Sequence, residues 1–433
     1  MTMAPHMAQH AAPHTAAHGS APARTGEPGD PSRAGRGKRL VGVDAARGLA
    51  LVGMVAVHTL PVYDAEAQRA TLAWSLFSGH ASALFALLAG VGLAFGSGGP
   101  APRTGRALTA ARCATAVRAL LLGLVGLSLS LLPLPVANIL PYYATLFLLA
   151  LPFLGLRIRH LLTAAAAAML LTPFLMQLAL DVLPPDVHGN PSLRTLAAHP
   201  EAVLPQLLLT GTYPALPWLA FLLTGLAIGR MDLREVEVQV RLMLAGAGLA
   251  VLGWGASAVA LGPLGGYDAI AAATPQYGTD RIDEVIVYGP DPELPTTTLW
   301  WLTVPGPHTN TPFAIALSLG VAVAALGLFL LLTRAPAPAA VLRPLTAAGA
   351  MTFTLYTAHL VLMAQRLHTG APVTWFWVQA ATALVLALLW RRLLGQGPLE
   401  RAVATASRCS GWAPSSCSRR PSGACAPGCA GPP

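Results

Sequence analysis

Residues 38–61, KRLVGVDAARGLALVGMVAVHTLP, form an apolar segment that is long enough to cross a bilayer, yet it contains Asp44, Arg47 and His58. Ionisable side chains at membrane depth are costly and usually face a partner or a cavity. Arg47 and His58 are eleven positions apart, which places them within about 20° on a helix and roughly 16 Å apart along its axis. Asp44 precedes Arg47 by three positions and can pair with it. One helix face therefore carries a paired cation near one end and an imidazole near the other.

The composition is that of a polytopic membrane protein. Of the 433 residues, 54% are hydrophobic and 10% are charged, and the mean hydropathy is +0.58, whereas soluble domains carry about a quarter charged residues. The net charge is +9, and the positive residues lie beside hydrophobic segments. Positive charge in such places orients the segments in the bilayer, so we expect no nucleic-acid partner. The five cysteines match no zinc spacing, and we predict no metal site.

The apolar segments predict an all-α fold of about ten transmembrane helices in residues 38–395. We expect a disordered tail at residues 1–37 and a low-complexity tail at residues 396–433. The sixth segment is short and begins with Tyr213, Pro214 and Pro217, which indicates a broken or re-entrant start. The ten segments are residues 40–60, 73–96, 115–134, 136–156, 160–180, 213–229, 242–262, 312–333, 345–366 and 372–394.

The distribution of charge predicts how the segments are oriented. With the N-terminus inside, the inner segments hold 22 of the 27 Arg and Lys, and the outer segments hold eleven of the eighteen acidic residues. Inner loops of membrane proteins carry the excess of Lys and Arg. We therefore predict a multi-pass protein of the plasma membrane with both termini in the cytoplasm.

Two long outer loops, residues 181–212 and 263–311, carry much of the acidic charge. Loops of this length are often functional. The second loop contains Trp300 and Trp301. We interpret this pair as part of an interfacial aromatic belt, which is commoner than a sugar-stacking platform.

The polar residues of the first segment suit acyl transfer across a membrane. An acyl thioester of coenzyme A is found in the cytoplasm, and a cell-surface acceptor lies outside. A channel between them needs a cation at the inner end for the anionic donor and a base near the outer end for the acceptor. Arg47 supplies a guanidinium that binds phosphate or carbonyl oxygen. His58 can take a proton from an acceptor hydroxyl or amine, or accept the acyl group itself. In the simpler alternative, Asp44 and Arg47 neutralise each other and His58 is an interfacial residue.

Other polar residues in the segments are further candidates. His80, at the start of the second segment, is a second candidate catalytic residue. Helix packing or interhelical hydrogen bonding is the alternative explanation for each of these residues. The candidate cavity-lining residues are Ser82, Asn138, Tyr213, Tyr356 and His359.

Several stretches resemble known membrane acyltransferases. Residues 39–51, RLVGVDAARGLAL, resemble the first helix of the heparan-alpha-glucosaminide N-acetyltransferase-like proteins, and residues 79–90, GHASALFALLAG, resemble their second helix. The spacing from Arg47 to His58 is similar to the motif of the acyltransferase 3 family, which belongs to the same broader group. Residues 211–230 and 349–359 resemble the bacterial domain of unknown function family 418.

The resemblance implies an integral membrane acyltransferase that binds no permanent cofactor. It would transfer an acyl group, expected to be acetyl, from cytoplasmic acyl-CoA to a carbohydrate or small-molecule acceptor on the outer side. The glucosaminide acetyltransferases have Asn in place of His58 and a catalytic His in the following loop, but residues 62–72 here contain no His. Either His58 or His80 takes that role, or the fold serves another purpose.

The alternative function is a multi-span transporter or exporter. Ten segments can divide into two inverted sets of five, with a binding site framed by segments 1 and 6. Segment 1 contains no proline, however, and the two halves show no sequence similarity that would indicate a repeat.

Overall fold

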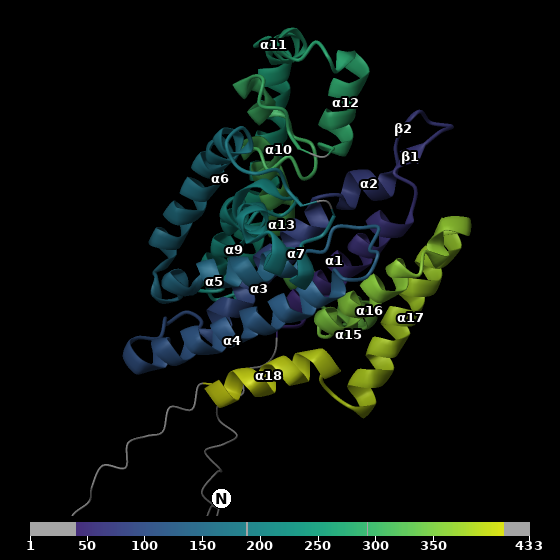
Figure 1. Cartoon of the computed structure of the whole chain (residues 1–433). Helices are drawn as coiled ribbons and strands as arrows, with labels where there is room; N and C mark the ends of the chain where they lie inside the picture. Colours follow the sequence, from purple (N-terminus) through teal and green to yellow (C-terminus); the bar gives the residue numbers. More distant parts are fainter. Residues whose placement is uncertain (1–39, 188, 292, 411–433) are drawn as a thin grey trace, which may run out of the picture. The chain divides into compact units, whose positions relative to one another are not determined.

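Helices account for nearly all the regular structure in residues 40–187, 189–291 and 293–410, which a computed structural model describes (Figure 1). Two short strands, β1 (Tyr63–Asp64) and β2 (Arg69–Ala70), form an antiparallel pair in which Tyr63 lies opposite Ala70. The predicted all-α class is therefore confirmed. The predicted tail at residues 1–37 lies outside the described residues.

Helix α1 packs against helices from both halves of the chain, and the second half contains the long helices α10 and α13, which are joined by the loop 263–311. In the first half the helices are α1 (Val41–Thr59), α2 (Leu72–Phe77), α3 (His80–Gly96), α4 (Gly105–Leu129), α5 (Leu140–Leu149), η1 (Leu151–Gly155), α6 (Ile158–Leu180), α7 (Leu193–Ala198), α8 (Pro200–Pro205) and η2 (Gln206–Thr210). In the second half they are α9 (Ala215–Ile228), α10 (Val236–Leu261), α11 (Gly266–Ala273), α12 (Gly278–Tyr288), η3 (Leu299–Thr303), α13 (Pro312–Leu332), α14 (Pro336–Val341), α15 (Arg343–Gly349), α16 (Thr352–Ala364), η4 (Leu367–Gly370), α17 (Pro372–Leu393) and α18 (Pro398–Ser410).

Within the described ranges, seven helical segments are long and apolar enough to cross a membrane, and two bent pairs raise the number to nine. The predicted count of ten is therefore not confirmed. The exception is the predicted segment 136–156, in which α5 has ten residues and is about 15 Å long, half the hydrocarbon thickness. Pro141 and Pro152 lie in the first turns of α5 and η1, where proline starts a helix but cannot continue one. The orientation of the termini stays a prediction.

Both bent pairs are interrupted by short non-helical links. Residues Pro200–Thr210 and Ala215–Ile228 meet at 44°, which confirms the predicted break before the sixth segment. Residues Arg343–Gly349 and Thr352–Ala364 meet at 83°, a bend that the sequence analysis did not predict.

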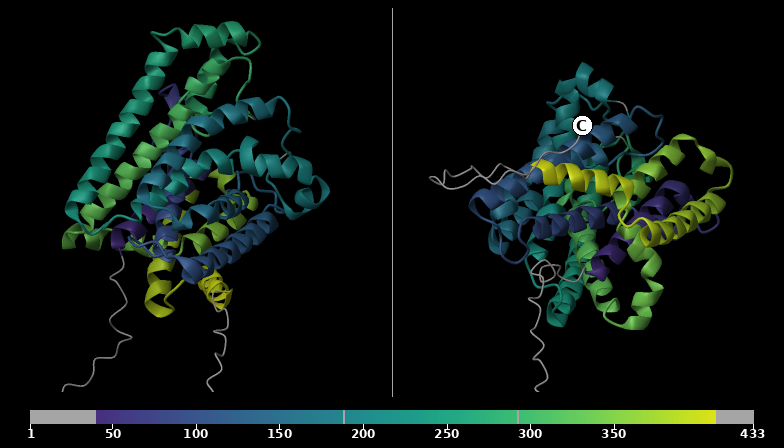
Figure 2. Two further views of the ribbon diagram at one scale, coloured as in Figure 1. Left: turned by 90° about the vertical axis from the view of Figure 1, so that its left-hand side faces the viewer. Right: turned by 90° about the horizontal axis from the view of Figure 1, so that it is seen from below.

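Helix α1 is buried against α3, α13, α15 and α17. It ends at Thr59 because Leu60 precedes Pro61 and takes an extended conformation, with φ −81° and ψ 154°. Two glycines let α1 and α15 approach closely: a Cβ on Gly48 would collide with the backbone of Leu345, and one on Gly349 with the backbone of Asp44. Helices α10 and α13 pack side by side along their length (Figure 2).

The loop 263–311 folds around a small hydrophobic cluster of its own, formed by α11, α12, η3 and the chain beside them. Trp301 lies in this cluster with no exposed surface, and its indole Nε1 donates hydrogen bonds to Thr274 and Thr297 at 3.1 and 3.2 Å. The interpretation of Trp301 as an interfacial residue is therefore wrong. A buried Trp needs a partner for its N–H, and these two threonines provide it.

The segment after Gly395 begins with a helix, not with the irregular structure predicted for residues 396–433. Helix α18 packs against α4 and α16 and lies beneath α4 in Figure 1. The prediction is thus wrong for residues 398–410, and residues 411–433 lie outside the described part of the chain. The local signal for this helix was Pro398 followed by Glu400 and an alanine-rich run.

Candidate functional site

A cavity of about 380 Å³ lies among α1, α3, α4, α5, α16 and α18. Most of its wall is apolar, as is usual for a small-molecule site. Helix α1 contributes Arg47, Met54 and His58, whose spacing of seven and four residues places them on one helix face. The polar lining residues are Arg47, His58, Ser82, Thr115, Arg118, Tyr143, Tyr213, Thr352, Tyr356, Glu400 and Ser407.

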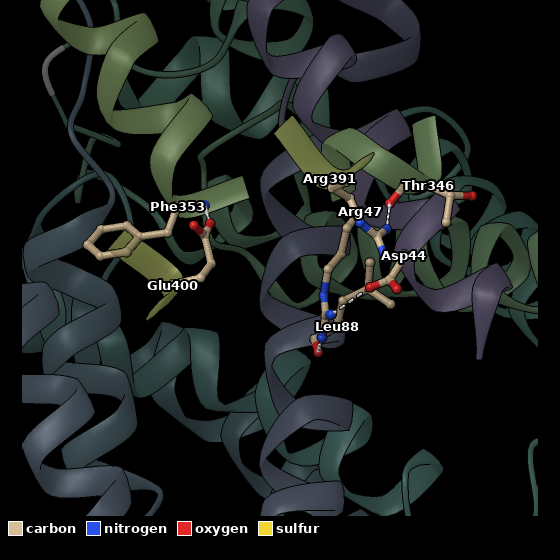
Figure 3. A network of polar contacts seen from close by, with 7 residues as sticks. All are labelled: Asp44, Arg47, Leu88, Thr346, Phe353, Arg391 and Glu400. Atoms are coloured by element: carbon tan, nitrogen blue, oxygen red, sulfur yellow. Dashed lines mark hydrogen bonds and ion pairs between the residues drawn. The ribbon is translucent and has the colours of Figure 1, made fainter. Parts of the chain in front are cut away.

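Arg47 is held in place from two sides at the cavity wall. Its Nη1 donates to Oδ1 of Asp44 at 3.3 Å and its Nη2 donates to the backbone oxygen of Leu88 at 3.1 Å (Figure 3). The Arg47 side chain keeps 25% of its surface exposed, whereas that of Asp44 keeps 3%. Asp44 does not line the cavity, and its carboxylate orients the Arg47 side chain.

His58 belongs to a chain of hydrogen bonds that joins three helices. Its Nδ1 lies 3.0 Å from Nε2 of His359 on α16, and the two rings stack with their planes 15° apart. Nδ1 of His359 lies 2.8 Å from Oε1 of Gln379 on α17. His359 is buried and lies behind His58, not in the cavity lining where we expected it.

Arg118 is a second cation of the cavity that the sequence analysis missed. It lies in the middle of α4. The side chain is exposed and lines the cavity, and its guanidinium lies 5.6 Å from the ring centre of Phe147. A charged residue inside an apolar helix was the signal that could have identified it.

Glu400 brings a carboxylate from α18 to the start of α16. Its Oε1 accepts from the backbone N–H of Phe353 at 2.8 Å (Figure 3) and from that of Thr354 at 3.1 Å. The first amides of a helix have no partner within the helix and carry a partial positive charge, so a carboxylate satisfies them well. Glu400 thereby joins α18 to α16 at the cavity wall.

Three of the predicted lining residues line the cavity: Ser82, Tyr213 and Tyr356. The Ser82 hydroxyl donates to the backbone oxygen of Gly79 at 2.9 Å, and the Tyr356 hydroxyl oxygen accepts from the N–H of Ile139 at 3.2 Å. These bonds fix both side chains at the wall.

Two other predicted residues lie away from the cavity lining. His80 faces α13, where its Nδ1 is 3.1 Å from the hydroxyl of Ser318. Asn138 is fully buried and donates to the backbone oxygen of Gly126 at 2.8 Å and to Ser130 at 3.0 Å. It satisfies backbone groups where the chain passes from α4 to α5.

A further imidazole, His308, comes from the loop 263–311 and contacts Tyr213 of the cavity lining. Its ring packs edge-on against Tyr213 at 5.1 Å, and its Nδ1 is buried without a hydrogen-bond partner. Burial and the neighbouring His80 lower the pKa of His308 to about 4. Its backbone φ of +60° is uncommon for a residue other than glycine, and such strain is typical of functional loops. Sequence spacing could not have identified it, because Tyr213 lies far away in the chain.

The fold and the cavity define a polytopic membrane protein in which arginine and histidine side chains line the same cavity. The sequence model of the family described as heparan-alpha-glucosaminide N-acetyltransferase, catalytic, matches residues 39–255, just over half of the chain. The protein belongs to this family. No curated protein sequence is matched at a significant level.

The matched region contains α1 to α9 and most of α10, and so includes Arg47, His58 and Arg118, whereas His359, Gln379 and Glu400 lie beyond it. Family membership indicates a membrane protein of the acetyltransferase class and does not favour the transporter alternative. Such an enzyme uses an acyl donor and an acceptor.

Proposed function

We propose that this protein transfers an acetyl group from cytoplasmic acetyl-CoA to an amine or hydroxyl of a carbohydrate or small molecule on the outer side of the plasma membrane. One observation carries the proposal: Arg47 and His58 line the same cavity, and the family is that of an N-acetyltransferase. The two residues are separated by roughly 16 Å along α1, about half the hydrocarbon thickness. A donor and an acceptor that enter from opposite sides would therefore meet inside the protein.

The donor end is formed by Arg47 and Arg118. Coenzyme A carries several phosphate charges, and the thioester carbonyl oxygen gains negative charge as the acceptor attacks. A guanidinium binds such oxygens through a planar fork and stays charged. Asp44 fixes the orientation of Arg47, while Arg118 lines the same cavity and adds a second positive charge.

The acceptor end uses His58 as the base, and its tautomer follows from its neighbours. The amide oxygen of Gln379 accepts a hydrogen bond, so Nδ1 of neutral His359 carries the proton. Nε2 of His359 then accepts from Nδ1–H of His58, which leaves Nε2 of His58 unprotonated. That nitrogen can take the proton of the acceptor as a new C–N or C–O bond forms and the C–S bond breaks; the coenzyme A thiolate recovers a proton.

His58 can instead act as a nucleophile, because an unprotonated imidazole nitrogen can attack the thioester directly. Coenzyme A would leave first, and the acetyl-imidazole would then pass its acetyl group to the acceptor. The two routes differ in one measurable way. Only the covalent route exchanges labelled coenzyme A into acetyl-CoA when no acceptor is present.

The test measures loss of the acetyl-CoA thioester in membranes that contain wild-type protein, with a panel of glucosamine-like amines and sugars as acceptors. Arg47→Ala and His58→Ala should each lower the rate by at least about a hundredfold, the usual contribution of a general base or a positioned charge. The matched controls are Arg159→Ala and His160→Ala on α6, both of which are exposed and outside the cavity. Equal rates in the site variants and the controls would contradict the assignment.

A further inference from the structure

A basic groove lies apart from the cavity and shares no lining residue with it. It is formed by the start of α1, by α14 and α15, and by the end of α17. Three arginines line it, Arg343, Arg391 and Arg392, beside apolar residues that include Val41 and Leu388. None of its lining residues is acidic.

The three guanidinium groups differ in how they are held. Arg391 donates from Nη1 to the backbone oxygen of Thr346 at 3.3 Å, which fixes it at the wall of the groove. Arg343 and Arg392 are exposed, and neither forms an ion pair with a carboxylate in the part of the chain that the structure describes. Guanidinium groups that line one groove without a carboxylate favour a phosphate oxygen as ligand, because they can bind it through charge-assisted hydrogen bonds.

The surroundings of the groove fit the headgroup level of a bilayer. Val341 and Leu393, next to groove residues in sequence, are each 79% exposed, so apolar side chains flank the cations. The chain also carries four Arg or Lys within residues 33–39, immediately before Val41 of the groove. Basic pockets between helices and basic clusters beside a first span are both features of anionic lipid recognition.

We infer that this groove binds a phosphate ester at the inner face of the membrane, supplied by the headgroup of an anionic phospholipid. The same phosphate chemistry is present in the nucleotide part of coenzyme A. The flanking apolar residues favour the lipid, since a lipid can place its acyl chains against Val341 and Leu393 while its phosphate meets the arginines. This inference does not depend on the proposed acetyl transfer.

The experiment counts the ligands that the purified full-length protein retains in native mass spectrometry. The probes are phosphatidylglycerol, phosphatidylcholine and coenzyme A, each added separately. Wild-type protein is compared with the double variant Arg343→Gln/Arg392→Gln and with the matched control Arg106→Gln/Arg159→Gln, which removes two exposed arginines from α4 and α6. A charge-retaining variant, Arg343→Lys/Arg392→Lys, is measured in parallel.

Wild-type protein and the control should prefer phosphatidylglycerol over phosphatidylcholine, and the groove variant should lose affinity for phosphatidylglycerol by about thirtyfold, as expected for two removed cations. The lysine variant should keep most of that preference. If only coenzyme A distinguishes the groove variant from the control, the groove binds the phosphates of a nucleotide, and the inferred lipid headgroup is overturned. The inference is overturned if neither probe distinguishes the groove variant from the control, or if wild-type protein shows no preference.

Discussion

At the scale of single residues, helical periodicity predicted that Arg47 and His58 share one face of a helix, but it did not predict which residues His58 contacts. Arg47 and His58 share one helix, so a rotation of 100° per residue was enough to place them on one face. His359 lies 301 residues after His58, and only the packing of α16 beside α1 brings the rings together. A long-range contact of this kind leaves no trace in the local spacing of either segment.

His359 and Gln379 are expected to act as positioning residues for His58. His359→Gln should lower kcat by about tenfold or more and leave the KM for acetyl-CoA nearly unchanged, because the tautomer of His58 would no longer be fixed. Initial rates across a pH series should also show a displaced profile, which a purely structural defect would not produce. His160→Gln on α6 serves as the control; a raised KM with unchanged kcat in His359→Gln would contradict this role.

His308 should make the stability of the protein depend on pH. Its pKa falls from the ordinary 6.5 to about 4 on folding, so the unfolded chain takes up the proton first as the pH decreases. The stabilisation is complete above pH 6.5 and is lost as the pH falls towards 4. Between about pH 7.5 and about pH 5 the unfolding midpoint of wild-type protein should drop more than that of His308→Gln. Equal drops would exclude this contribution; His199→Gln, at an exposed position, is the control.

At the scale of helices, the lengths of the apolar stretches predicted most of the membrane-spanning segments but did not predict every position at which a segment is bent. Hydropathy detects how many apolar residues follow one another, and it does not detect an 83° bend between α15 and α16. That bend exposes the first amides of α16, and Glu400 of α18 satisfies them from another part of the chain. The pairing could not be predicted, because it depends on where α18 packs and not on the sequence around residue 350.

Removal of the Glu400 carboxylate should destabilise the contact between α18 and the start of α16. Glu400→Ala leaves the amides of Phe353 and Thr354 without an acceptor and is expected to lower the free energy of unfolding by about 1–2 kcal/mol. Glu400→Gln keeps an acceptor oxygen and should cost less. The midpoint of thermal unfolding measures both, and Glu237→Ala, an exposed acid on α10, is the comparison. An effect of Glu400→Ala no larger than that of Glu237→Ala would mean that the carboxylate contributes little.

At the scale of the whole molecule, the chain between α4 and α6 decides the topology. Arg103 precedes α4 and Arg106 lies in its first turn, while Arg157 and Arg159 follow η1, so the positive-inside rule predicts that residues 130–156 cross the membrane. Helix α5 alone is too short for this. Irregular backbone is tolerated at membrane depth where protein buries it or where it lines a cavity. Most of α5 is buried, and Ala137 and Ile139 line the cavity.

We therefore expect residues 104 and 157 to lie on the same, inner side. In a background with the five native cysteines replaced, Thr104→Cys and Arg157→Cys should both resist a membrane-impermeant maleimide added to right-side-out vesicles, whereas Leu132→Cys, in the exposed turn after α4, should react. Permeabilised vesicles provide the control, because all three positions should then be labelled. Labelling of residue 157 but not of residue 104 from outside would mean that the segment does not cross. The termini would then lie on opposite sides, since the number of spans would be odd, and a donor that enters beside Arg47 would no longer share a side with α18.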